Sequence, residues 1–228
     1  MKTPSLPRVM VVTCLGFLFL LTGCFEIVED VTLRRDGSGT FKVVANLSQS
    51  KTQLKSVMLL DSINGYPVPK EMEIDRQMRK AAEAMAQTSG ISSMSVNTDF
   101  ENFIFTMSCE FDNIQTLNQA IEAAAKHMHR GKDPLPKIES FRFVEGTFER
   151  IGKYTTAKVF SQLNQQDKAA FEGANYVAVY RFENEVSTIS NPSAKKSANG
   201  KTVFLKLPIE DLLLEKSNLS NSIQLLAP

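Results

Sequence analysis

The sequence contains very little histidine, which limits the chemistry expected of it. The chain has 2 histidines, His127 and His129, and their spacing places them on different faces of a helix that ends there. A zinc site would need further ligands, and no cysteine or other histidine lies at a suitable spacing. We therefore expect surface histidines, with no bound metal and no cofactor.

Motifs of the common catalytic sites are also missing. The sequence has no G-x-S-x-G, no P-loop and no G-x-G-x-x-G after a strand. Asp36-Gly37-Ser38-Gly39 is too short to cradle a phosphate and is typical of a turn. Glu26, Glu29 and Asp30 could pair for acid–base chemistry, but they occupy expected polar positions of a strand and are predicted to be solvated. We expect the protein not to be an enzyme.

Neither sign of charge dominates the chain. It contains 26 Lys and Arg residues against 25 Asp and Glu residues. This balance gives no electrostatic reason to expect nucleic acid or an anionic membrane surface as the main partner. Arg34 and Arg35 are predicted to be ordinary surface charges, although their closeness in sequence to the N-terminal segment could let them contact lipid headgroups.

The N-terminal segment has the layout of a secretory signal peptide. Residues 1–8 carry two cations, Lys2 and Arg8, and no acid, and residues 9–21 form a nearly unbroken apolar run. That run is short for a bilayer span, so a permanent anchor is the less favoured alternative. A basic start, a short apolar core and small residues before a junction are typical of a peptide that is removed. We predict a signal peptide over residues 1–23.

The end of this segment, Leu21-Thr22-Gly23-Cys24, resembles the lipobox of bacterial lipoproteins. The resemblance implies that a diacylglycerol is attached to the Cys24 thiol and that Cys24 becomes the first residue of the mature protein. Two or more acyl chains give stable membrane anchoring. We therefore expect a lipoprotein of the bacterial cell envelope, lipidated at Cys24. Phe25 at the next position, by resemblance to Gram-negative lipoproteins, favours the outer membrane, with the domain facing the periplasm.

The other cysteines do not form a disulfide framework. Cys14 leaves with the signal peptide, so Cys109 is left beside Cys24. Cys109 is in phase with large apolar residues between Phe103 and Phe111 and is predicted to be a small buried side chain. A catalytic thiol would need a cationic or helix-terminal setting, which nothing nearby in the sequence supplies.

Alternating apolar and polar residues predict a β-hairpin at the start of the mature chain. Residues 27–33 and 41–47 alternate around a turn at 36–39. Helical spacing follows after Ser48 and again after Pro69. These elements form a hairpin–helix unit at about 25–88.

The next part of the chain repeats this plan without residue-level identity. Residues 91–96 and 103–111 are expected strands around a turn at 99–102, and residues 113–128 have helical spacing. The unit spans about 91–129. The sequence leaves open whether the two units share one sheet.

The rest of the chain, about 138–228, is expected to add a strand near Phe143, a helical stretch from 157 to 171 and a final hairpin. The hairpin pairs residues 176–189 with residues 202–207 across a long polar turn. We therefore expect a single α+β domain over residues 24–228. It should contain antiparallel sheet built from β-hairpins, with helices packed on one face.

Two parts of the sequence resemble small envelope lipoproteins of the LppM-like kind. The first is the cysteine followed by a strand and a D-G-S-G turn. The second begins at Phe171 with F-E-G-A-N-Y-V-A-V-Y-R-F-E-N-E-V-S-T-I-S-N-P and continues with N-G-K-T-V-F-L-K-L-P-I, where Phe204 lies in the region in which that pattern has a tryptophan. The resemblance implies an envelope protein of poorly defined role, with lipid handling as one option. It transfers no catalytic residue.

Three functions follow from these observations. The favoured one is a lipid-anchored, non-catalytic interaction or assembly module with an envelope protein as partner. The alternative is a protein that binds lipid or another hydrophobic ligand, because the 9 methionines could line an apolar cleft between sheet and helices. An envelope hydrolase is the least favoured, since the sequence shows no nucleophile–base pair. Little linker separates Cys24 from the first strand, so the domain is predicted to lie close to the bilayer.

Overall fold

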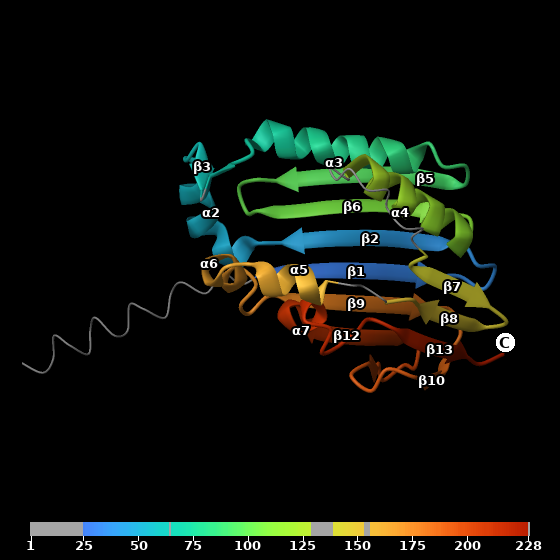
Figure 1. Cartoon of the computed structure of the whole chain (residues 1–228). Coiled ribbons are helices and arrows are strands. Elements are labelled where there is room, and N and C mark those ends of the chain that lie inside the picture. The colour runs from blue at the N-terminus through green and yellow to red at the C-terminus, as the bar shows by residue number, and fades with distance from the viewer. Residues whose placement is uncertain (1–24, 64, 129–138, 153–155, 228) are drawn as a thin grey trace, which may run out of the picture.

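A seven-stranded sheet is the main element of the computed structural model, which describes residues 25–63, 65–128, 139–152 and 156–227 (Figure 1). Its strand order is β11-β12-β9-β1-β2-β6-β5. The bounds are β1 (Glu26–Leu33), β2 (Gly39–Asn46), β5 (Ile91–Asp99), β6 (Ile104–Phe111), β9 (Asn175–Phe182), β11 (Lys195–Lys196) and β12 (Thr202–Pro208). β1 and β9 pair in parallel, whereas the other neighbouring strands pair antiparallel.

The two hairpins predicted from the sequence share this one sheet. β2 pairs with β6 along its whole length, from Gly39 opposite Phe111 to Asn46 opposite Ile104. This register places Phe41 opposite Cys109, and both side chains are buried. The prediction of Cys109 as a buried side chain is therefore confirmed, and burial raises the pKa of its thiol to about 11.

A four-stranded sheet packs on one face of the larger sheet, with the order β10-β13-β8-β7. Its strands are β7 (Phe141–Val144), β8 (Thr147–Arg150), β10 (Val186–Ile189) and β13 (Asn221–Leu225). The single strand predicted over residues 176–189 is wrong, because the chain leaves the larger sheet after Phe182 and joins the smaller one at Val186. β8 and β13 have only four and five residues, too few for a clear alternation pattern.

Two long helices cover the part of the same face next to β5 and β6. α3 (Glu71–Ala86) contacts β5 and α4 (Ile114–Met128), and α4 contacts β5, β6 and β7. Their buried residues recur at helical spacing, with Ala81, Ala82 and Met85 in α3 and Ile114 and Leu117 in α4. The α+β class with antiparallel sheet and helices on one face is confirmed.

The remaining elements are short. They are the 3-10 turn at Ser48–Ser50, α2 (Lys51–Met58), the hairpin β3 (Ser62–Ile63) and β4 (Tyr66–Pro67), α5 (Ala157–Gln162), α6 (Gln165–Ala169) and α7 (Ile209–Leu213). The helical stretch predicted over residues 157–171 is thus two helices. The break occurs because Leu163 and Asn164 are extended, and Asn164 caps α6 by accepting a hydrogen bond from Asp167 N at 2.8 Å. None of the helices in the described ranges has the length and apolarity that crossing a membrane would need.

Aromatic rings fill the space between the two sheets. Phe148 of the smaller sheet lies 5.8 Å from Phe141, 5.1 Å from Tyr180 and 5.5 Å from Phe182, measured between ring centroids. Phe141 also contacts Phe41 in an edge-to-face arrangement at 6.4 Å. Such pairs contribute roughly 0.5–1.5 kcal/mol each beyond the burial of their area. The centre of the molecule is therefore packed with side chains.

Candidate recognition surface

The two ends of β1 define two ends of the molecule. Phe25 immediately precedes β1 and is held in place by its carbonyl, which accepts a hydrogen bond from Asn175 N at 2.9 Å. Arg34 follows β1 at its other end, and a strand of 8 residues spans roughly 25 Å. We call the edge that contains Phe25 the anchor end, and the edge that contains the turns at 34–38, 145–146 and 183–185 the turn end. Cys24, the predicted lipidation site, lies outside the described residues and precedes Phe25, the first residue that the structure describes.

The turn between β1 and β2 is held by local hydrogen bonds. Arg34 N donates to Ser38 O at 2.8 Å, and Gly37 adopts a φ of 85°, which glycine tolerates best. Asp36 Oδ1 accepts from both the Oγ and the backbone N of Ser38, at 2.7 and 2.9 Å. These hydrogen bonds lower the pKa of Asp36, because they favour its charged form. The turn presents Arg35 to solvent.

Arg35 joins two turns at the turn end. Its backbone N donates to Glu183 Oε2 at 2.9 Å, and its Nε donates to Asn184 Oδ1 at 2.7 Å. Arg34 and Arg35 thus lie a strand's length from Phe25. The contact with lipid headgroups that sequence proximity suggested is not supported, because an extended strand carries the two arginines away from the anchor end.

A cleft of about 600 Å³ lies beside Arg35, between the β1–β2 turn, α4 and β7. α4 contributes carboxamides to it, and β7 contributes an apolar wall. The lining residues are Arg35, Asp36, Gly37, Asn113, Ile114, Gln115, Asn118, Gln119, Glu122, Glu139, Phe141, Arg142, Phe143 and Val144.

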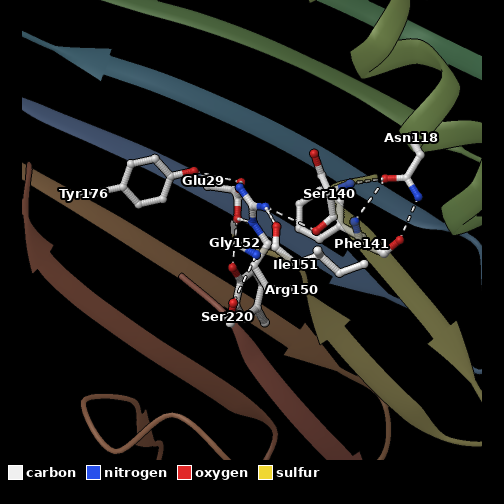
Figure 2. A network of polar contacts seen from close by, with 10 residues as sticks. Glu29, Asn118, Ser140, Phe141, Arg150, Ile151, Gly152, Tyr176 and Ser220 are labelled. Carbon is white, nitrogen blue, oxygen red and sulfur yellow. Dashed lines mark hydrogen bonds and ion pairs between the residues drawn. The ribbon is translucent and has the colours of Figure 1, made fainter. Parts of the chain in front are cut away.

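Asn118 fixes the position of that wall. Its Nδ2 donates to Phe141 O at 2.7 Å, and its Oδ1 accepts from the backbone N of both Ser140 and Phe141 at 3.0 Å (Figure 2). Asn113 caps the start of α4, since its Oδ1 accepts from Thr116 N at 2.9 Å. The cleft is thus built on rigid elements, which favours binding with little reorganisation.

Two smaller hollows continue from this cleft on the other side of Arg35. One, of about 430 Å³, lies among Arg34, Phe143, Gly146, Gln224 and the β9–β10 turn. The other, of about 320 Å³, lies between that turn and Lys201. Arg35 lines all three spaces, so they form one branched surface around its guanidinium.

Amides, charged groups and apolar residues line this surface. None of the described residues that line the three spaces is a serine, threonine, cysteine or histidine. Several of its acids already have partners: Glu122 pairs with Lys126 at 2.7 Å, Glu139 pairs with Arg142 at 3.1 Å, and Glu183 accepts from Arg35 N at 2.9 Å. The groups offered to a ligand include carboxamides, arginines and the Phe143 ring, which bind by hydrogen bonding and stacking, and the charged side chains of Glu145, Glu185 and Lys201.

A buried polar network joins the two sheets next to this surface (Figure 2). Glu29 of β1 and Arg150 of β8 are each 5% exposed. Arg150 Nε donates to Glu29 Oε1 and Arg150 Nη2 donates to Glu29 Oε2, both at 2.9 Å. Arg150 Nη1 donates to the carbonyls of Ser140 and Ile151 at 3.2 and 2.7 Å. A two-point pair of this kind fixes the position of one sheet on the other.

The sequence-based prediction that Glu29 is solvated is therefore wrong. Glu29 shares the inward phase of Val31 and Leu33, and this phase was the available signal. A buried carboxylate is tolerated here because it receives four hydrogen bonds, two from Arg150 and one each from Tyr176 OH and Tyr180 OH at 2.8 Å. Burial raises the pKa of both tyrosines well above the ordinary value, and the Glu29 charge adds to the effect. The network is internally satisfied, so we interpret it as structural.

The predicted histidine positions contribute no site in the described structure. His127 is exposed in the last turn of α4, and His129 lies outside the described residues. In the ranges that the structure describes, no three His, Cys, Asp or Glu side chains are grouped so that they could hold a metal ion. The Arg35 surface was not predicted from the sequence, because its residues come from segments far apart in the chain.

The chain shows similarity to solved structures but not to a protein family. No family model matches the chain, and no curated protein matches it. The chain is similar to the folded domain of LppM from Mycobacterium tuberculosis, solved by NMR, with a TM-score of 0.44 and 10% sequence identity. The similarity covers 90% of this chain and 91% of that domain.

Proposed function

We propose that the protein is a lipid-anchored, non-catalytic lipoprotein of the bacterial cell envelope that acts as an interaction module through its turn end. Cys24 carries the acyl chains, and the signal peptide over residues 1–23 is removed. The outer membrane, with the domain facing the periplasm, is the location that Phe25 favours. The partner is an envelope protein that binds the branched surface around Arg35.

The observation that carries this proposal is the separation of the two ends along β1. Phe25, the residue after Cys24, lies at one end of the strand, and the clefts around Arg35 open at the other end, roughly 25 Å away. A surface held at that distance from a membrane is accessible to a protein in the periplasm. The carboxamide and arginine lining supports binding by hydrogen bonds.

A second candidate function, binding of lipid or another hydrophobic ligand, is favoured by a hollow at the anchor end. This hollow, of about 600 Å³, lies between α2, the start of α3 and the β5–β6 turn. Its described lining contains Met58, Leu59, Met72, Phe100 and Phe103. Methionine and aromatic side chains of this kind accept acyl chains.

Mass spectrometry of the protein purified from its native membranes tests the anchor. We expect a denatured mass that corresponds to residues 25–228 plus an acylated Cys24, and a Cys24→Ser variant without the acyl mass. Cys109→Ser is the matched control, since that thiol is buried and should leave acylation unchanged. An unmodified mass for residues 1–228 would refute the lipoprotein assignment.

Site-specific photocrosslinking in cells tests the recognition surface. A photoreactive residue at Val144, which lines the cleft and is 56% exposed, should give an adduct of one defined mass. Ser95, exposed on β5, is the control position and should give none. The adduct at Val144 should weaken in an Arg35→Ala background. If no adduct forms, and the native protein retains a bound lipid in its mass, the second candidate function replaces the first.

A further inference from the structure

The anchor end exposes large apolar side chains that the fold leaves uncovered. Leu59 is 84% exposed, Met72 is 82% exposed and Tyr66 is 72% exposed. Leu60 is also exposed, next to Leu59 in sequence. Leu59 and Met72 line one hollow together with Met58, and contiguous apolar exposure is typical of interaction sites. We call Met58, Leu59, Leu60, Tyr66 and Met72 the α2–α3 surface.

Strand register places this surface beside the start of β1. Asn46, the last residue of β2, pairs with Glu26, the first residue of β1. The chain then turns into α2, and Leu47 N donates to Phe103 O at 2.9 Å. In Figure 1, α2 and β3 lie at the end of the sheet where β1 begins. The α2–α3 surface and Phe25 therefore belong to the same end of the molecule.

The surface combines an apolar floor with charged side chains at its edge, among them two lysines. Met58, Leu59 and Met72 line the 600 Å³ hollow, and its charged lining residues are Lys55, Lys70 and Glu71. Lys70 Nζ reaches Leu60 O and Asp61 Oδ1, both at 3.4 Å, so its ammonium stays at the rim. Apolar side chains beside lysines, with a tyrosine nearby, are the composition found where proteins meet the interface of a bilayer.

We propose that the α2–α3 surface lies in the interface of the bilayer that holds Cys24, a proposal that rests on the lipid anchor proposed above. Consecutive Cα atoms are about 3.8 Å apart, so the acyl chains on Cys24 enter the bilayer immediately beside Phe25. No linker lets the domain move away, because β1 begins at Glu26. Tethering gives the apolar side chains a high effective concentration at the membrane, so even a weak contact is populated.

The contact orients the domain. The lipid and the α2–α3 surface give two separated points of attachment, which restrict tilting of the sheet about the anchor. β1 then points away from the membrane, and the Arg35 surface faces the periplasm at the far end. The exposed apolar residues thus orient the domain so that the Arg35 surface faces away from the membrane.

Depth measurement with spin labels tests the contact. Acylated full-length protein carrying Leu59→Cys or Val144→Cys is reconstituted in vesicles of phosphatidylethanolamine and phosphatidylglycerol. The Cys24 thiol is occupied by lipid, and burial raises the pKa of Cys109 to about 11, so the introduced cysteine is the one that labels near neutral pH. We expect the label at position 59 to be relaxed more by oxygen than by a water-soluble nickel chelate. Position 144 should show the reverse.

The outcomes separate this proposal from the anchor on which it rests. Both labels in the aqueous phase, on protein that resists an alkaline carbonate wash, would overturn the membrane contact and leave the anchor intact. Protein that washes off would show that the anchor itself fails. A label at position 59 shielded from both reagents would mean that a protein partner or a single bound ligand covers the surface, which would also overturn the proposal.

A double variant, Leu59→Gln with Met72→Gln, provides a second readout. Both side chains are more than four-fifths exposed, so the fold should be unaffected. With a label at Tyr66→Cys, we expect the preference for oxygen to be lost in this variant. The matched control, Val144→Gln at the turn end, should leave it unchanged. An oxygen preference that persists in the double variant would contradict a role for these side chains.

Discussion

The two ends of the seven-stranded sheet differ in what they expose. The anchor end presents apolar side chains such as Leu59 and Met72, whereas the turn end presents Arg35 within clefts lined by carboxamides. Both ends are made of connections between strands, which a rigid sheet can carry without changing its core. The difference teaches that one strand, β1, separates an apolar surface from a polar surface centred on Arg35.

The turn end depends on the smaller sheet, and the anchor end does not. β7 forms a wall of the large cleft, and the smaller sheet is held to the larger one by the Glu29–Arg150 pair. The α2–α3 surface is built from segments next to β2, β5 and β6. Breaking the pair between the sheets should therefore affect the two ends unequally.

Arg150→Ala should have the largest effect. The change leaves the Glu29 carboxylate buried without its cation, which costs about 3–5 kcal/mol of unfolding free energy. The loss should appear as a lower urea midpoint. The variant should also lose the adduct at Val144 while the spin label at position 59 keeps its preference for oxygen. Arg142→Ala is the control, because its ion pairs with Glu139 and Glu149 are half exposed and contribute at most about 1 kcal/mol. An equal decrease of the urea midpoint in the two variants would contradict a special role for the buried Glu29–Arg150 pair.

Tyr180→Phe should have an intermediate effect. The phenol donates to Glu29 Oε1 at 2.8 Å, and its removal leaves the buried carboxylate with one donor fewer, at a cost of about 1–3 kcal/mol near neutral pH. The urea midpoint measures this loss. Tyr66→Phe is the matched control, since that ring is largely exposed and its loss of a hydroxyl should change the midpoint little.

The same network predicts sensitivity to alkaline pH. Burial raises the pKa of Tyr176 and Tyr180 in the folded protein above the unfolded value of about 10, so the folded state disfavours the phenolate. Their contribution to stability is complete below that unfolded value and is lost as pH rises toward the folded pKa. Unfolding free energy should fall above pH ~10, and the fall should be smaller in a Tyr176→Phe, Tyr180→Phe variant. The raised pKa of Cys109 acts in the same direction, so both proteins are compared in a Cys109→Ala background.

Arg35→Ala should have the smallest effect on stability. Its Nε makes an exposed hydrogen bond to Asn184, so about 0.5–1.5 kcal/mol is at stake. The backbone hydrogen bond from residue 35 to Glu183 remains. Arg35→Ala should instead weaken partner binding, measured as loss of the Val144 adduct. Arg34→Ala should retain more of that adduct, because Arg34 does not line the large cleft. An adduct that survives Arg35→Ala would show that the Arg35 side chain does not contribute to binding of the partner.

Local elements were predictable from the sequence because their signals are local. The alternation of residues 27–33 and 41–47 around Asp36-Gly37-Ser38-Gly39 corresponds to β1 and β2, and the spacing of residues 113–128 corresponds to α4. The inward phase of Glu29 was visible too, but its partner Arg150 lies 121 residues away in a strand too short to recognise. The Arg35 surface could not be predicted, since α4, β7 and the β9–β10 turn meet only in the folded chain.

The sequence by itself determined the hairpins, the long helices and the position of Cys24 directly before the first strand, because each rests on residues within a few positions of one another. Only the tertiary structure decided the parallel pairing of β1 with β9, the second sheet and the assignment of Arg35 and the α2–α3 surface to opposite ends. The physical reason is that these features depend on backbone pairing and packing between distant segments, such as Glu26 opposite Asn175, which leave no periodic trace in either segment alone.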